Sequence, residues 1–95
     1  MYQAYNRLLT FCSVRHAIRA EELLMKAGIK VASMPIPREI DITCGQCILF
    51  MAEQEAQLMA VIRDKNVLWT ELFTRDDVNK EYEKIAEYED NVKGV

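Results

Sequence analysis

The feature that most restricts the fold is the order in which short apolar segments alternate with longer segments of helical periodicity. Short apolar runs bounded by polar residues are typical of buried strands, whereas apolar residues three or four apart favour a helix. The order is strand, helix, strand, strand, helix, strand, which predicts an α+β fold, a ferredoxin-like β-α-β-β-α-β two-layer sandwich with strand order 4-1-3-2 and both helices on one face. The expected strands are residues 5–12, 29–34, 47–52 and 67–73, and the expected helices are 14–27 and 53–65.

Capping residues support these boundaries. Ser13 can cap the first helix, Gly28 suits the position after its end, and Asn66 ends the second. Residues 76–89 have high helix propensity and a thin apolar stripe, so we expect an added C-terminal helix. The chain should therefore divide into a ferredoxin-like domain at residues 1–74 and a C-terminal helical extension at residues 75–95.

Composition excludes several classes of function. The chain has 95 residues and a net charge of -3 with no long basic run, which argues against nucleic-acid binding. No apolar run approaches the roughly 20 residues that span a bilayer, and the first residues do not resemble a signal peptide. We therefore expect a cytoplasmic protein without membrane contact, whose three cysteines are reduced thiols.

Both prolines and two of the three cysteines lie in PIPREIDITCGQC, residues 35–47. The predicted topology brings this loop to the end of the sheet where the first strand finishes, beside Cys12, Ser13 and His16. The prolines stiffen the loop, and Gly45 allows a tight bend that would leave the Cys44 sulfur accessible. The positive N-terminal end of the first helix, with Arg38 or His16, would favour a thiolate there.

Each of these side chains also has a simpler interpretation. Cys12 and Cys47 lie on predicted strands and fit as small buried apolar residues, whereas Cys44 follows polar residues and is expected to be exposed. His16 fits as a solvated residue of the first helical turn, and Arg38 fits as half of a surface ion pair with Glu39. Cys44 and Cys47 form a CxxC motif, but this motif precedes a strand rather than a helix, which weakens a redox interpretation. A zinc site is also disfavoured, because a closed zinc site needs four ligands and the motif supplies two. We expect no metal and no cofactor.

The sequence resembles a bacterial family of small selenium/sulfur-carrier-like domains over about residues 5–73. The resemblance consists of a Ser-x-x-His-Ala-x-x-Ala-Glu helix start, a Pro-Arg-Glu turn, and Cys-Gly entering a strand. Cys47 departs from the family pattern, in which a small or apolar residue is usual. The matching residues are Ser13, His16, Ala17, Ala20, Glu21, Pro37, Arg38, Glu39, Cys44 and Gly45.

The resemblance implies a sulfur or selenium carrier, or an accessory protein of a sulfur relay, with a persulfide or selenosulfide on Cys44. Such a protein is a carrier rather than a turnover enzyme, and its partners are donor and acceptor proteins. The supporting residues would be Gly45, Arg38, His16, Ser13 and Cys47. Two alternatives stay open: a non-catalytic interaction module that docks to a larger enzyme, and a thiol-disulfide switch between Cys44 and Cys47 or Cys12.

The first, third and fourth predicted strands are apolar on both faces, although two helices can cover only one. We therefore expect the other face to be covered by a second copy in a homodimer, by the C-terminal helix, or by both.

Overall fold

A computed structural model describes residues 5–11, 13–40, 45–76 and 78–88. Its elements follow the expected order up to the fourth strand and then depart from it. They are β1 (Arg7–Phe11), α1 (Val14–Lys26), β2 (Ala32–Pro35), β3 (Gln46–Phe50), a short 3-10 turn (Ala52–Gln54), α2 (Glu55–Asp64), β4 (Glu71–Asp76) and β5 (Glu81–Glu87).

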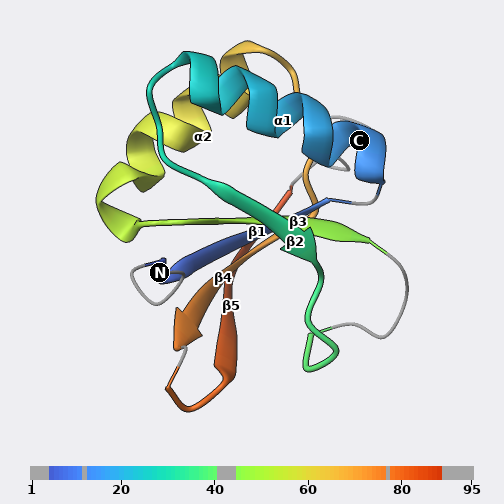
Figure 1. Ribbon diagram of the computed structural model, residues 1–95, viewed down its shortest axis with the longest axis vertical. Coiled ribbons are helices and arrows are strands. Elements are labelled where there is room, and N and C mark those ends of the chain that lie inside the picture. Colours follow the sequence, from blue (N-terminus) through green and yellow to red (C-terminus); the bar gives the residue numbers. More distant parts are fainter. Residues whose placement is uncertain (1–4, 12, 41–44, 77, 89–95) are drawn as a thin grey trace, which may run out of the picture.

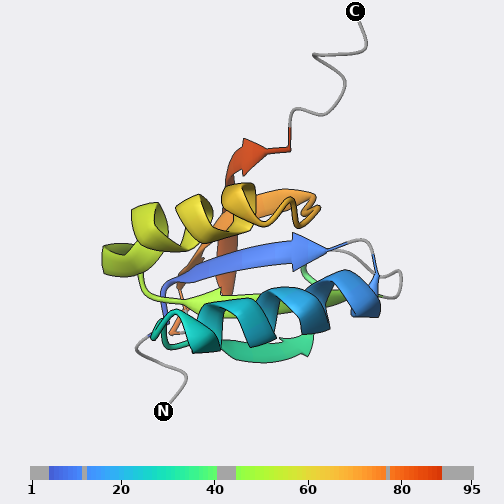
Figure 2. The same cartoon turned by 90° about the horizontal axis from the view of Figure 1, so that it is seen from above.

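The strands form one antiparallel sheet in the order β2-β3-β1-β4-β5. Figure 1 shows α1 and α2 together on one side of this sheet, and Figure 2 shows the two helices running beside each other. The α+β class and the shared face of the helices are therefore confirmed. The first four strands have the expected neighbours, and β5 adds a fifth at the edge beside β4.

Local signals set the helix boundaries as expected. The Ser13 hydroxyl caps α1 by accepting a hydrogen bond from the His16 backbone N–H at 3.3 Å. After α1, Gly28 has a φ of 83°, the left-handed conformation in which glycine commonly ends a helix. Asn66, with a φ of 56°, has the same role after α2.

The face of the sheet under the helices holds the larger cluster of buried side chains. Three alanine or leucine positions of α1 are fully buried, so the helix lies close to the sheet. This cluster contains Leu9, Phe11, Ala17, Ala20, Leu24, Ile29, Ile48, Phe50, Leu58, Ile62, Val67 and Leu72.

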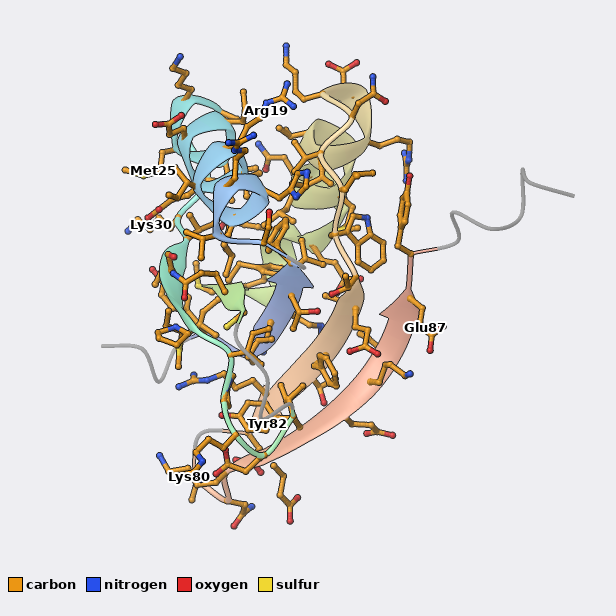
Figure 3. The ribbon with its side chains drawn as sticks, turned by 90° about the vertical axis from the view of Figure 1, so that its right-hand side faces the viewer. Arg19, Met25, Lys30, Lys80, Tyr82 and Glu87 are labelled. Atoms are coloured by element: carbon orange, nitrogen blue, oxygen red, sulfur yellow. The ribbon has the colours of Figure 1, made fainter. Side chains whose placement is uncertain are left out.

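The opposite face, called here the helix-free face, is covered within one chain. Its buried centre contains Leu8, Cys47, Leu49 and Phe73. The segment after β2 folds across this centre, and a tyrosine of β5 packs beside it (Figure 3). The structure thus removes the reason for expecting a second copy on this face. The partly buried side chains that cover the centre are Tyr5, Ala32, Met34, Ile36, Ile40 and Tyr82.

The C-terminal helix predicted over residues 76–89 is wrong, because residues 81–87 form β5. A turn precedes this strand. The Asp76 carboxylate accepts hydrogen bonds from the backbone N–H groups of Val78 and Asn79 at 3.1 and 3.2 Å, and Lys80 has a φ of 55°. Such an aspartate-asparagine turn folds the chain back into a hairpin, which takes precedence over the weak helix propensity of the following residues. Most of the described part of the predicted extension therefore belongs to the sheet, through the end of β4 and the whole of β5.

The fourth strand begins later than predicted, at Glu71 rather than Val67. Thr10 of β1 fixes this start, because its backbone oxygen accepts from the Thr70 N–H at 2.9 Å. Its buried hydroxyl also accepts from the Glu71 N–H at 3.0 Å and bonds to the Thr70 hydroxyl. The segment between α2 and β4 is therefore bound to the end of β1 before regular pairing starts.

Candidate functional site

The candidate site lies at the end of the sheet where β1 and β2 finish and β3 begins. The register pairs Gln46 with Phe11 of β1 on one side and with Pro35 of β2 on the other. Ser13 follows β1 directly, and Gly45 immediately precedes β3. The expectation that the loop of residues 35–47 meets the start of α1 at one end of the sheet is therefore confirmed for the described residues.

Ser13 and His16 form a linked pair at the first turn of α1. The Ser13 hydroxyl lies 2.8 Å from His16 Nδ1 and also caps the helix. This contact orients the half-buried imidazole at the end of the sheet where β3 begins. The pair is thus a structural unit of the helix start, and the histidine is more enclosed than a fully solvated side chain.

Gly45 is required by close packing rather than by a left-handed turn. A β-carbon at this position would lie 2.7 Å from Ile36 Cδ1 and 3.4 Å from the Phe11 carbonyl oxygen. The Ile36 N–H also donates to the Gly45 oxygen at 3.2 Å. The glycine therefore lets the segment after β2 lie directly against the strand that follows the loop.

Replacement of Gly45 by alanine is expected to lower the free energy of unfolding by about 1 kcal/mol, because the Ile36 side chain must move. Urea denaturation measures this change. In an Ile36→Val background, which lacks the clashing methyl group, the same alanine should cost less than about 0.5 kcal/mol. An equal cost in both backgrounds would contradict the packing explanation.

Cys47 lies at the centre of the helix-free face, with no exposed surface. Its Sγ lies 3.8 Å from the Pro35 carbonyl oxygen. Burial raises the pKa of its thiol from 9.0 to about 12, although the Arg75 guanidinium opposes this shift. The interpretation of Cys47 as a core residue is therefore confirmed, and the thiol is protonated at neutral pH.

Arg75 and Tyr82 join Cys47 from β4 and β5, and sequence reasoning assigned neither to the site. The Arg75 guanidinium donates to the Tyr5 carbonyl oxygen at 2.8 Å. Burial raises the pKa of the Tyr82 hydroxyl, while Arg75 lowers it and the charge of Glu39 raises it. The loop residue Glu39 is thus near enough to β5 to affect its tyrosine. The aspartate-asparagine turn before residue 81 was the signal that could have placed Tyr82 on a strand.

Arg38 and Glu39 are exposed on the turn after Pro37, where the Ile40 N–H donates to the Pro37 oxygen at 3.0 Å. Cys12 and Cys44 lie outside the described residues. Within the described ranges, no three histidine, cysteine, aspartate or glutamate side chains gather as metal ligands would.

A hollow of about 410 Å³ lies elsewhere, between the end of α2 and β5. Trp69 and Tyr88 meet there edge to face, with ring centroids 5.8 Å apart. None of the predicted site residues lines this space, which is called here the Trp69–Tyr88 hollow.

The sequence model of the family described as "Putative Se/S carrier protein-like" matches residues 6–74, from the start of β1 into β4. The chain belongs to this family. The match includes α1, the loop after β2 and Cys44, and it ends before β5. The family match therefore covers every residue predicted for the site.

One similar protein, from Aquifex aeolicus (strain VF5), carries the name "Putative sulfur carrier protein". It is 32% identical over 82 residues, which are 84% of this chain and 41% of that relative. The chain thus spans about two fifths of the relative's length. No solved structure matches the chain. Neither helix in the described ranges has the length and apolar composition that crossing a membrane requires.

Proposed function

We propose that this protein carries sulfur, or selenium in its place, on the Cys44 Sγ as a persulfide or selenosulfide. Membership of the Se/S carrier family and the name of the Aquifex relative support a carrier. The donor and acceptor are other proteins of a sulfur relay. We also propose that the first four strands and the two helices form a ferredoxin-like arrangement.

The burial of Cys47 is the observation that carries the choice of Cys44. Sulfur transfer needs a thiolate that a second molecule can reach. Cys47 has no exposed surface, and its pKa of about 12 keeps the thiol protonated. It is therefore unsuited to this role in the folded protein. Of the remaining two cysteines, Cys44 is the one within the loop that the family pattern marks.

Loading follows from ordinary thiol chemistry. The Cys44 thiolate attacks the outer sulfur of a donor persulfide, R–S–SH. A new S–S bond forms to Cys44, the S–S bond of the donor breaks, and the donor leaves as its thiolate, R–S⁻. The transferred sulfur keeps its proton, so charge is conserved and no external oxidant is needed. Delivery to an acceptor is the same exchange in the opposite direction.

The loop around Cys44 has features that suit such an exchange. Pro35 and Pro37 restrict the backbone, which reduces the entropy lost when a partner docks. Arg38 is exposed on this loop and offers a fork of donors to a carboxylate of the partner or to the thiolate itself. The loop is anchored by Ile36 and Ile40, which pack on the helix-free face.

Intact mass after incubation with glutathione persulfide tests the proposal. The wild type should gain the mass of one sulfur atom, and dithiothreitol should remove it. Cys44→Ser should abolish loading, whereas Cys12→Ser and Cys47→Ala should retain it. Circular dichroism checks that each variant is folded. Loading that persists unchanged in Cys44→Ser would eliminate the carrier mechanism and favour the interaction module.

A further inference from the structure

Residues 36–40, called here the strap, cross the helix-free face. The strap begins at the end of β2, which is one edge of the sheet, and its two isoleucines pack on the buried centre that contains Cys47. The charge of Glu39 affects the Tyr82 hydroxyl of β5, which is the opposite edge. Figure 3 places Tyr82 beside the segment that leaves β2. The strap therefore reaches from one edge of the sheet toward the other and covers the Cys47 thiol.

Among the described residues, the backbone bonds the strap to the rest of the chain only at its start. The Ile36 N–H donates to the Gly45 oxygen at 3.2 Å, whereas the Ile40 N–H bonds within the strap, to the Pro37 oxygen at 3.0 Å. Pro37 itself has no N–H to donate. Side-chain packing therefore decides whether the far end of the strap stays on the sheet.

Tyr82 is placed to hold the far end of the strap. It lies directly opposite Arg75 in the pairing of β4 with β5, and Arg75 faces the same side of the sheet as Phe73 two positions before it. The Arg75 guanidinium donates to the Tyr5 carbonyl oxygen at 2.8 Å, which fixes its position, and a side-chain hydrogen bond links it to the Tyr82 hydroxyl. The opposite charges of Arg75 and Glu39 thus lie on either side of one hydroxyl.

We propose that Tyr82, positioned by Arg75, is the catch of the strap, and that the closed strap protects a sulfur carried on Cys44 from the thiol of Cys47. This inference rests on the proposed carrier function. Cys47 follows Cys44 by three positions, and under the closed strap it has no exposed surface. Both residues of the catch lie beyond residue 74, where the family match ends.

An open strap would allow Cys47 to discharge the carrier. In water its thiol has an ordinary pKa and forms the thiolate more readily. This thiolate attacks Cys44 Sγ of the persulfide, an S–S bond forms between the two cysteines, the bond to the outer sulfur breaks, and that sulfur leaves as hydrosulfide, HS⁻. Charge is conserved and no oxidant is needed. The sulfur would then be lost to solvent instead of reaching an acceptor.

Labelling of Cys47 tests the catch without any sulfur transfer. In a Cys12→Ser, Cys44→Ser background Cys47 is the only thiol, so its rate of reaction with iodoacetamide at pH 8 measures opening of the strap. Tyr82→Ala should raise this rate about tenfold, and Tyr82→Phe, which keeps the ring, about threefold or less. Ile85→Ala is the matched control, because Ile85 is exposed on the same strand, and it should leave the rate unchanged.

Two further measurements separate strap opening from global unfolding. The labelling rate should be nearly independent of urea at low concentration, because a local opening exposes little surface. In an Ile40→Ala background, where the strap is already loosened, Tyr82→Ala should add no more than about twofold. A second tenfold increase there would overturn the proposal, as would a labelling rate that rises only as far as the loss of global stability requires.

Sulfide release tests the protective role of the strap. In a Cys12→Ser background, protein loaded with glutathione persulfide is checked by intact mass, and Tyr82→Ala should then release hydrosulfide about tenfold faster than the unsubstituted catch. Addition of Cys47→Ala should restore slow release. Equal release with and without Tyr82→Ala would refute the protective role. If the protein does not load while Tyr82→Ala still exposes Cys47, the carrier mechanism and the protective role are wrong and the catch itself is correct.

Discussion

Alkylation of Cys47 by iodoacetamide at pH 7 is expected to be about a thousandfold slower in the folded protein than in the unfolded chain. The thiolate is the reactive species, and a pKa of about 12 instead of 9.0 lowers its fraction by this factor. The absence of exposed surface adds a steric barrier. Peptide mass spectrometry after timed labelling gives the rate at each cysteine separately.

Transient unfolding does not abolish the expected difference in the alkylation rate of Cys47 between the folded and the unfolded protein. At a stability of about 5 kcal/mol, roughly one molecule in several thousand is open at any time. The unfolded reference is the same protein in guanidinium chloride at the same pH. If Cys47 reacted in the folded state within about tenfold of that reference rate, its assignment as a buried, protonated thiol would be wrong.

The burial of Cys47 and its raised pKa also argue against the disulfide-switch hypothesis. A resolving cysteine attacks as a thiolate and must approach the sulfur that it attacks. Cys47 is protonated and enclosed by the segment that includes Ile36 and Ile40. A Cys44–Cys47 disulfide would therefore require this segment to leave the helix-free face first. A single-thiol carrier needs no such opening, which is why we favour it.

Much of the fold was predictable because its signals are local. Ser13, Gly28 and Asn66 mark helix ends in the sequence, and the structure shows each in that role. Apolar runs separated by two amphipathic helices then leave few topologies for the first four strands. The meeting of the turn after β1 with the loop of residues 35–47 at one end of the sheet follows from chain direction alone, and the pairing of Gln46 with both Phe11 and Pro35 confirms it.

The C-terminal strand was not predictable from helix propensity. Residues 81–87 contain glutamates, lysine and alanine, which favour helices in isolation. Pairing with β4 decides the outcome, since Tyr82 gains a place on the helix-free face and Ala86 one near the core under the helices. A register shift opposite Leu72 and Phe73 allows the side chains of Tyr82 and Ala86 to face opposite sides of the sheet. Such packing between residues that are distant in the sequence is poorly indicated by the local sequence pattern.

The candidate site was predicted in part for the same reason. The sequence indicated which turns meet, but not that Arg75 of β4 would lie near the Cys47 thiol. That proximity depends on the pairing of β1 with both β3 and β4. Gly45 was expected to provide a tight bend, whereas the structure shows that it is needed for close contact with Ile36. A contact between residues nine positions apart depends on how the loop folds over the sheet.

The stability of the folded chain is expected to fall by about 3 kcal/mol between pH 9 and pH 12 through Cys47 alone. Above pH 9 the unfolded chain releases the thiol proton, whereas the folded chain retains it to about pH 12. The unfolded state therefore binds fewer protons, so raising the pH favours it. This contribution is fully present below pH 9 and decreases by about 1.4 kcal/mol per pH unit above it.

Urea denaturation of the wild type and Cys47→Ala at pH 8, 9, 10 and 11 isolates this effect, because all other titrating groups are common to both chains. At pH 8 the wild type should be the more stable protein, since alanine leaves a small cavity in the helix-free face. Its advantage should shrink as the pH rises and reverse by about pH 11. Tyr82→Phe serves as the second control, because burial also raises the pKa of that hydroxyl.

A stability difference between wild type and Cys47→Ala that stayed constant across this range would mean that the thiol ionises as readily in the folded as in the unfolded chain. Cys47 would then again be a candidate for the reactive sulfur.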